Sequence, residues 1–225
     1  MKTNYRLNPL FALLTSFISV AYLFYIRGDH PCCSMFWSNL SRKLLKAFGW
    51  ELATPPTDRK YVAVGAPHTT NWDLPLTFLL ISSYRVRFQF MMKASLFKGP
   101  LGPLARRLGG ISIYRDRKMN LVEQAAQAIK EADDFVLGIP AEGTRKHTDF
   151  WKSGFYHIAT QAEVPVHFGF IDYKAKRLGM SPGFVPTGDI TADMDKVRAF
   201  YEPLTPKFPA QKSRILLKAE VDGPH

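Results

Sequence analysis

The sequence YVAVGAPHTTNWD occupies residues 61–73, and the apolar stretch LPLTFLLISSY follows it at residues 74–84. The short apolar run 61–65 predicts a buried strand, whereas residues 74–84 have the pattern of a helix. Pro75 is compatible with that helix because it falls in the first turn, where its missing N–H costs no hydrogen bond. His68 is therefore expected on a turn between a strand and a helix, with Asp73 where the helix begins.

His68 and Asp73 form a pair that suits general-base chemistry. A neutral imidazole can take a hydroxyl proton near pH 7 when its other nitrogen donates to a carboxylate, which fixes the tautomer and stabilises the imidazolium that forms. Asp73 follows five positions after His68, a spacing that can place it in this role across a turn. The competing interpretation is that Asp73 caps the helix, worth about 1 kcal/mol, and that His68 is an ordinary loop residue.

Beyond residue 60, apolar runs alternate with helical patterns. Strands are predicted over residues 61–66, 86–92, 110–114, 135–140 and 164–173, and helices over 74–84, 101–108, 120–132, 150–162 and 191–201. This alternation predicts an α/β domain with a largely parallel sheet flanked by helices. Asn120 and Glu123 have the spacing of a capping box at the start of one of these helices.

Arginines follow two of the predicted strands. Arg115 comes after residues 110–114, and Arg145 ends the sequence EGTR at residues 142–145, which follows the strand 135–140. A guanidinium binds phosphate through two parallel hydrogen bonds, and ligands of open α/β sheets gather outside the carboxyl ends of the strands. Both arginines and His68 are therefore expected to converge. The alternatives are an exposed ion pair between Glu142 and Arg145, and a local pair between Arg115 and Asp116.

Four blocks occur in order along the chain: His68 to Asp73, Gly109 to Arg115, Glu142 to Arg145, and Val164 to Val166. Together they resemble the glycerolipid acyltransferase superfamily, typified by lysophosphatidic acid acyltransferases, over about residues 61–173. The resemblance implies that His68 is the general base and that Asp73 orients it. It assigns binding of the acceptor phosphate to Arg115, Glu142, Gly143, Thr144 and Arg145.

The sequence leaves other parts of this site open. Lys93, between the first two blocks, is a further candidate for substrate binding, with a solvated lysine as the alternative. Backbone N–H groups near Val164 or Val166, or Lys93 itself, are candidate donors to the oxyanion. The chain also departs from the family pattern. Ala141 stands where a proline usually precedes the EGTR glutamate, and HFG follows at residues 167–169 where another proline is common.

The resemblance implies an enzyme that moves a fatty acyl group from acyl-CoA or acyl-carrier protein to the free hydroxyl of a lysophospholipid, with lysophosphatidic acid as the favoured acceptor. The acyl thioester donor is a co-substrate, and no cofactor is implied. Two alternatives remain. One is a transacylase or an acyltransferase for another lysolipid, and the other is a non-catalytic protein that binds anionic membranes.

Composition narrows the partners. The chain has 225 residues, 46% of them hydrophobic, which is enough for one sizeable core, and its net charge of +11 implies an anionic partner. Basic residues are dispersed without a nucleic-acid-binding signature, so an anionic membrane surface is favoured over nucleic acid. The only cysteines, Cys32 and Cys33, are adjacent and exclude a disulfide framework, and the six histidines lack metal-ligand spacing, so no metal is expected.

Residues 1–52 are expected to associate with the membrane, and residues 60–225 to form the acyltransferase domain. The uncharged run 10–26 predicts an apolar helix of ~26 Å, barely enough to span a hydrocarbon core of ~30 Å. A cleaved signal peptide is the alternative, although no small-residue cleavage site follows the run. Residues 35–48 predict an amphipathic helix that lies in the membrane interface or packs on the core. The cytosolic acyl donor places the catalytic domain on the cytoplasmic side.

Overall fold

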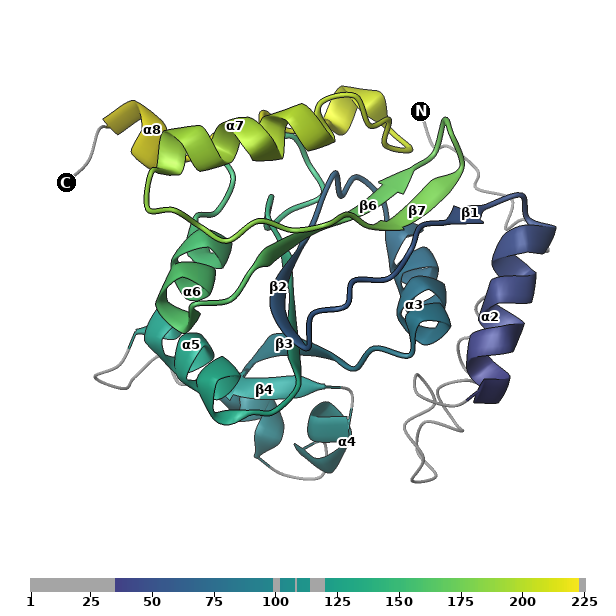
Figure 1. Ribbon diagram of the computed structural model, residues 1–225, viewed down its shortest axis with the longest axis horizontal. Coiled ribbons are helices and arrows are strands. Elements are labelled where there is room, and N and C mark those ends of the chain that lie inside the picture. The colour runs from purple at the N-terminus through teal and green to yellow at the C-terminus, as the bar shows by residue number, and fades with distance from the viewer. Residues whose placement is uncertain (1–34, 99–101, 108, 114–119, 223–225) are drawn as a thin grey trace, which may run out of the picture.

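The computed structural model describes residues 35–98, 102–107, 109–113 and 120–222 (Figure 1). The helices are α2 (Met35–Ala47), α3 (Asp73–Tyr84), α4 (Gly102–Arg107), α5 (Leu121–Glu131), α6 (Gly154–Ala162), α7 (Ile190–Tyr201) and α8 (Lys218–Asp222), with 3-10 turns η2 (Ala94–Phe97) and η3 (Pro209–Gln211). The strands are β1 (Glu51–Leu52), β2 (Lys60–Gly65), β3 (Phe88–Lys93), β4 (Gly110–Ile113), β5 (Phe135–Pro140), β6 (Val166–Asp172) and β7 (Arg177–Met180).

The strands form a seven-stranded sheet in the order β1-β7-β6-β2-β5-β3-β4. Neighbours are parallel except β6 and β7, which form an antiparallel pair. The prediction of an α/β fold with a largely parallel sheet flanked by helices is therefore confirmed. Strands β2 and β5 lie side by side in a register that pairs Gly65 with Pro140, so the residues after both strands emerge at the same edge of the sheet.

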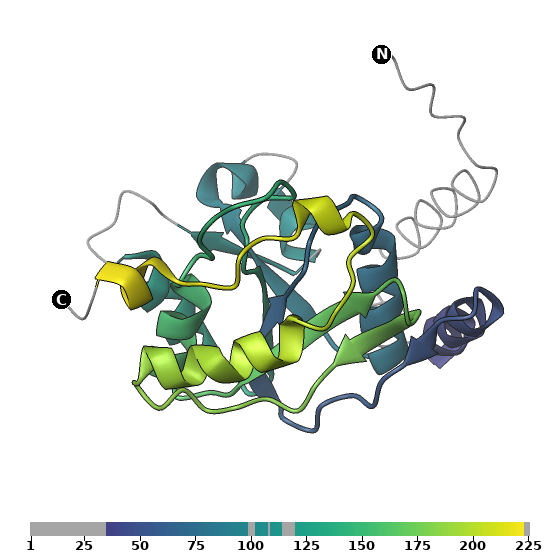
Figure 2. The same ribbon diagram turned by 90° about the horizontal axis from the view of Figure 1, so that it is seen from above.

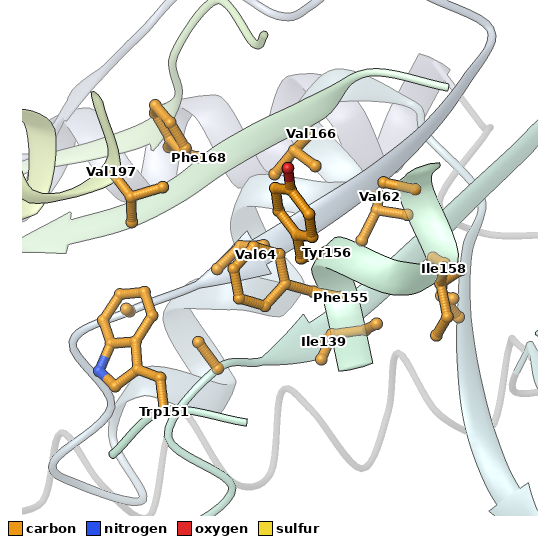
Figure 3. Packing of buried hydrophobic residues seen from close by; sticks show 14 of the residues in the cluster. Val62, Val64, Ile139, Trp151, Phe155, Tyr156, Ile158, Val166, Phe168 and Val197 are labelled. Atoms are coloured by element: carbon orange, nitrogen blue, oxygen red, sulfur yellow. The ribbon is translucent and has the colours of Figure 1, made fainter. Parts of the chain in front are cut away.

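The core has two halves, one on each face of the sheet. On one face, Val62 and Val64 of β2 pack with side chains of α5, α6 and α7, and Figure 3 shows these valines near Phe155 and Ile158 of α6. On the other face, residues of β2 such as Tyr61 pack with α3 and with Leu45 of α2. Because β2 is covered on both faces, its run is apolar throughout instead of alternating.

Local signals that the sequence carries are reproduced in α5. The Asn120 side chain accepts the N–H of Glu123 at 3.0 Å, and the Glu123 carboxylate accepts the N–H of Asn120 at 3.0 Å, which completes the predicted capping box. Ala125 and Ile129 are fully enclosed on the face that meets α6. The cap and the buried stripe therefore fix where this helix starts and how it is oriented.

Several short elements were not predicted. Strands β1 and β7 have two and four residues, and α8 has five, so each is too short to show a period. The predicted strand 164–173 is β6, followed by a turn into β7. The predicted helix 150–162 begins only at Gly154, because Trp151 bridges to Leu217 and is buried in the core.

Helix α2 covers most of the predicted amphipathic segment 35–48 and packs against α3. The Ser38 hydroxyl donates to the Ser83 carbonyl at 3.1 Å, and the Arg42 guanidinium donates to the same carbonyl at 2.8 Å. Met35 and Phe36 at the start of α2 remain 62% and 67% exposed. The predicted apolar helix 10–26 lies outside the described residues, and within the described ranges no helix combines the length and apolarity that crossing a bilayer requires.

Candidate active site

His68 lies three residues beyond the end of β2, and Asp73 is the first residue of α3. The His68 Nδ1 and the Asp73 Oδ2 are 2.8 Å apart. The same oxygen accepts the backbone N–H groups of Thr69 at 3.1 Å and Thr70 at 3.2 Å. The Asp73 carboxylate therefore turns back into the loop before the helix, and its side chain is only 6% exposed. The predicted pairing of His68 with Asp73 is present in the structure.

The surroundings of His68 decide which ring nitrogen is basic. An ionised carboxylate only accepts hydrogen bonds, so Nδ1 carries the proton that faces Asp73, and Nε2 keeps its lone pair. Nε2 makes no hydrogen bond to any residue in the described ranges, and the His68 side chain is 31% exposed. This imidazole can accept a proton from a bound ligand through Nε2.

Glu142 follows β5, the strand beside β2, and is 2% exposed. Its Oε2 accepts the backbone N–H of His68 at 2.7 Å. Burial raises the pKa of the Glu142 carboxyl, whereas the hydrogen bonds from His68 and Ser213 act in the opposite direction. The resemblance implied that Glu142 binds the acceptor phosphate. In the structure its carboxylate accepts hydrogen bonds from protein donors and links the EGTR turn to the backbone of His68.

A hollow of about 390 Å³ opens beside the His68 ring and is lined by His68, Pro140, Gly143, Thr144, Arg145 and Lys146. Gly143 has a positive φ of 65°, which a residue with a side chain rarely adopts, so glycine suits this turn. Arg145 is exposed, and its guanidinium donates to the side-chain oxygen of Asn71, within the first block. The hollow therefore combines one imidazole with two cationic side chains, an arrangement suited to an anionic ligand that carries a hydroxyl.

The chain after α7 returns across the molecule through η3 towards α8 (Figure 2) and bonds to the loops that carry His68 and Arg145. The Phe208 N–H donates to the Thr69 hydroxyl at 3.4 Å across 139 positions of sequence. With its amide oriented to satisfy both groups, Gln211 donates to the carbonyls of Thr69 and Arg145 at 2.9 Å. Sequence reasoning missed this segment because no motif marks it and its partners are remote along the chain.

Two more residues reach the Asp73 side of the site. The Tyr173 hydroxyl, just after β6, donates to the Asp73 Oδ1 at 2.7 Å. The Lys207 ammonium lies 4.7 Å from the centre of the Trp72 ring and 5.8 Å from that of Tyr173. Burial lowers the pKa of Lys207, whereas the Asp73 carboxylate acts in the opposite direction. Neither Tyr173 nor Lys207 was predicted as a site residue from the sequence.

Other predicted site residues are placed differently or not described. Arg115 lies outside the described residues, and Lys93 is the last residue of β3, which β5 separates from β2 in the sheet. The expectation that N–H groups near Val164 or Val166 face the oxyanion is wrong. These groups donate to the Ala159 and Phe184 carbonyls, and Val166 pairs with Val62 near the opposite end of β2 from His68.

Two further features of the described ranges bear on the site. A larger hollow of about 690 Å³ is bordered by residues 53–58, the end of β7 and the last turn of α7, but His68 does not line it. Among the described residues, no group of three or more His, Cys, Asp and Glu side chains could hold a metal ion. The smaller hollow is the better candidate because it contains the only ring nitrogen described here with both a carboxylate-oriented partner nitrogen and an open lone pair.

Comparisons with known proteins place the chain in a family. The family model described as Acyltransferase matches residues 51–167, just over half of the chain. No curated protein matches. Among solved structures, the 1-acyl-sn-glycerophosphate (LPA) acyltransferase PlsC from Thermotoga maritima has a similar fold, with a TM-score of 0.52 and 19% identity over 84% of this chain and 90% of that chain. The chain therefore belongs to the acyltransferase family.

Proposed function

We propose that this enzyme transfers a fatty acyl group from an acyl thioester, acyl-CoA or acyl-carrier protein, to the free hydroxyl of a lysophospholipid, with lysophosphatidic acid as the favoured acceptor. The observation that carries the proposal is the geometry of His68. Its Nδ1 is held by the buried Asp73 carboxylate while Nε2 stays open beside a hollow bordered by Arg145 and Lys146.

In the proposed reaction, His68 Nε2 takes the proton of the acceptor hydroxyl as its oxygen attacks the thioester carbonyl carbon. The tetrahedral intermediate then expels the thiolate as the C–S bond breaks, and the imidazolium returns the proton to sulfur. Asp73 stabilises the imidazolium between these steps. The donor already carries an activated acyl group, so the reaction needs no acyl-enzyme.

A phosphorylated acceptor is supported by the charge around the hollow. Arg145 presents a planar fork suited to two phosphate oxygens, and the neighbouring Lys146 adds a second positive charge. The same arrangement holds the acceptor hydroxyl within reach of His68, which lowers the entropic part of the barrier. The PlsC enzyme with the similar fold is a 1-acyl-sn-glycerophosphate acyltransferase.

A panel of donors and acceptors tests the proposal. Purified protein in detergent would receive acyl-CoA or acyl-carrier protein together with lysophosphatidic acid, and thiol release and phosphatidic acid would both be measured. A monoacylglycerol with the same chain serves as the acceptor without phosphate. Thioester-dependent product with strong preference for the phosphorylated acceptor supports the proposal. Equal use of both acceptors contradicts the phosphate assignment, and product formed from a phospholipid without thioester identifies a transacylase.

We also propose that the enzyme works on the cytoplasmic face of an anionic membrane. The lipid acceptor requires access to a bilayer, and the net charge of +11 favours an anionic surface. Leu74 and Phe78, on the first turns of α3 directly after Asp73, are 57% and 42% exposed. Co-sedimentation with vesicles of phosphatidylglycerol, compared with phosphatidylcholine alone, tests this. Binding that is independent of both headgroup charge and salt concentration would contradict the electrostatic attraction to an anionic membrane.

A further inference from the structure

The two oxygens of the Asp73 carboxylate accept hydrogen bonds from different parts of the chain. Oδ2 accepts from the His68 ring and from the N–H groups of Thr69 and Thr70, all within the same turn. Oδ1 accepts from the Tyr173 hydroxyl at 2.7 Å, across 100 positions of sequence. The carboxylate is nearly closed off from solvent, with 6% of its side chain exposed, so water has little access to either oxygen.

Tyr173 is itself held in place from several directions. Its N–H donates to the Thr205 carbonyl at 2.9 Å, and its ring meets Trp50 edge-on with centres 5.4 Å apart. Burial and the Asp73 carboxylate raise the pKa of Tyr173, so the phenol stays a donor throughout the working pH range. The tyrosine therefore presents a fixed proton to a charged acceptor, which makes this hydrogen bond short and strong.

From this geometry we infer that Tyr173 is a positioning residue for the acyl-transfer reaction, acting on His68 through Asp73. The inference rests on the proposed role of His68 as the base. By anchoring Oδ1, the hydroxyl fixes the rotation of the carboxylate that directs Oδ2 to the His68 ring. By donating to the carboxylate it also draws negative charge away from Asp73, so Asp73 holds the imidazole proton less tightly. Tyr173 lies beyond residues 51–167, the part matched by the family model.

The two effects have separate kinetic signatures. Tyr173→Phe keeps the ring and its contact with Trp50 but removes the donor. A looser carboxylate should lower kcat about tenfold, as expected for one hydrogen bond to a charged group, while the KM values for donor and acceptor stay within about twofold. Without the hydrogen bond from Tyr173, the Asp73 carboxylate holds the imidazole proton more firmly. The acid limb of the pH profile of kcat should therefore move to higher pH by about half a unit.

Tyr84→Phe is the matched control. Tyr84 is a buried tyrosine in the same half of the core, and its hydroxyl donates to the Ala53 carbonyl at 2.6 Å. Loss of this hydroxyl should lower thermal stability without moving the pH profile. Replacing Tyr173 by 3-fluorotyrosine provides a second probe that keeps the packing. Its hydroxyl is the stronger donor, so the acid limb should move to lower pH.

The outcomes separate this inference from the proposed function. If His68→Ala abolishes turnover while Tyr173→Phe keeps the wild-type kcat and pH profile, the role of Tyr173 is refuted and the base remains. If Tyr173→Phe changes kcat without shifting the acid limb, and 3-fluorotyrosine causes no opposite shift, Tyr173 does not act through Asp73 and the inference falls. If His68→Ala retains full turnover, the proposed base and this inference fall together.

Discussion

His68 with Asp73 and His167 with Asp58 are two histidine–aspartate pairs with the same separation, 2.8 Å from ring nitrogen to carboxylate. They differ in the second nitrogen. His68 leaves Nε2 open at a hollow, whereas His167, which also borders a hollow, has Nδ1 2.9 Å from the Ser181 carbonyl and Nε2 bound to Asp58. His167 is also only 3% exposed. A carboxylate partner therefore orients an imidazole, but the imidazole is available as a base only when its other ring nitrogen is unoccupied.

Replacing each histidine in turn is the strongest test of this difference. His68→Ala should lower kcat by on the order of 10²–10⁴, the usual contribution of a positioned general base, without loss of folding. The readout is thiol release with saturating acyl-CoA and lysophosphatidic acid, with circular dichroism to check the fold. His157→Ala, at an exposed position on α6, is the matched control and should behave as wild type. Near-normal turnover in His68→Ala would remove His68 from the mechanism.

The two aspartates should separate in the same way with a smaller effect. Asp73→Asn should lower kcat by on the order of 10²-fold, because an amide N–H favours the wrong imidazole tautomer and cannot stabilise the imidazolium. Asp58→Asn should leave kcat nearly unchanged, since His167 does not line the hollow beside His68. Measuring kcat for both variants in parallel tests whether the two aspartates differ in this way. A similar loss in the two would mean that the carboxylates act through folding, which melting temperatures would reveal.

Substitution of Arg145, which borders the hollow beside His68, should have a smaller effect on the kinetics. Arg145→Lys keeps the charge but loses the planar fork, so the acceptor KM should rise about fivefold, corresponding to one lost hydrogen bond of about 1 kcal/mol. The KM for the thioester donor should change little. Lys152→Arg is the control, because it exchanges one cationic group for another at an exposed lysine beside Gly143. Unchanged acceptor kinetics in Arg145→Lys would restore the interpretation of Arg145 as a surface residue.

The smallest effect on turnover is expected from the second pair. His167→Ala should leave kcat within about twofold of wild type while lowering the free energy of unfolding by about 2–3 kcal/mol, from the lost packing against Tyr61 and the unpaired Ser181 carbonyl. Urea unfolding and initial rates measure the two quantities. A large loss of kcat at unchanged stability would show that this pair takes part in the reaction.

The local parts of this site could be predicted from the amino-acid sequence. The apolar run before His68 specified a strand buried on both faces, and the five-residue spacing specified an Asp73 that can reach the ring across one turn. Both depend on contacts between residues close in sequence, which periodicity and turn chemistry encode directly. The capping box of Asn120 and Glu123 was predictable for the same reason.

How these parts meet depends on contacts between residues that are distant in sequence. The pairing of β2 with β5 brings Glu142 under the His68 backbone, and the end of β6 brings Tyr173 to Asp73. His167 and Tyr173 carry no local signal, because their partners lie 109 and 100 positions away. Strand order and register are set by the packing of whole faces of the sheet. Residue type and spacing therefore cannot reveal which histidine ring nitrogen lacks a hydrogen bond or which hydroxyl donates to Asp73.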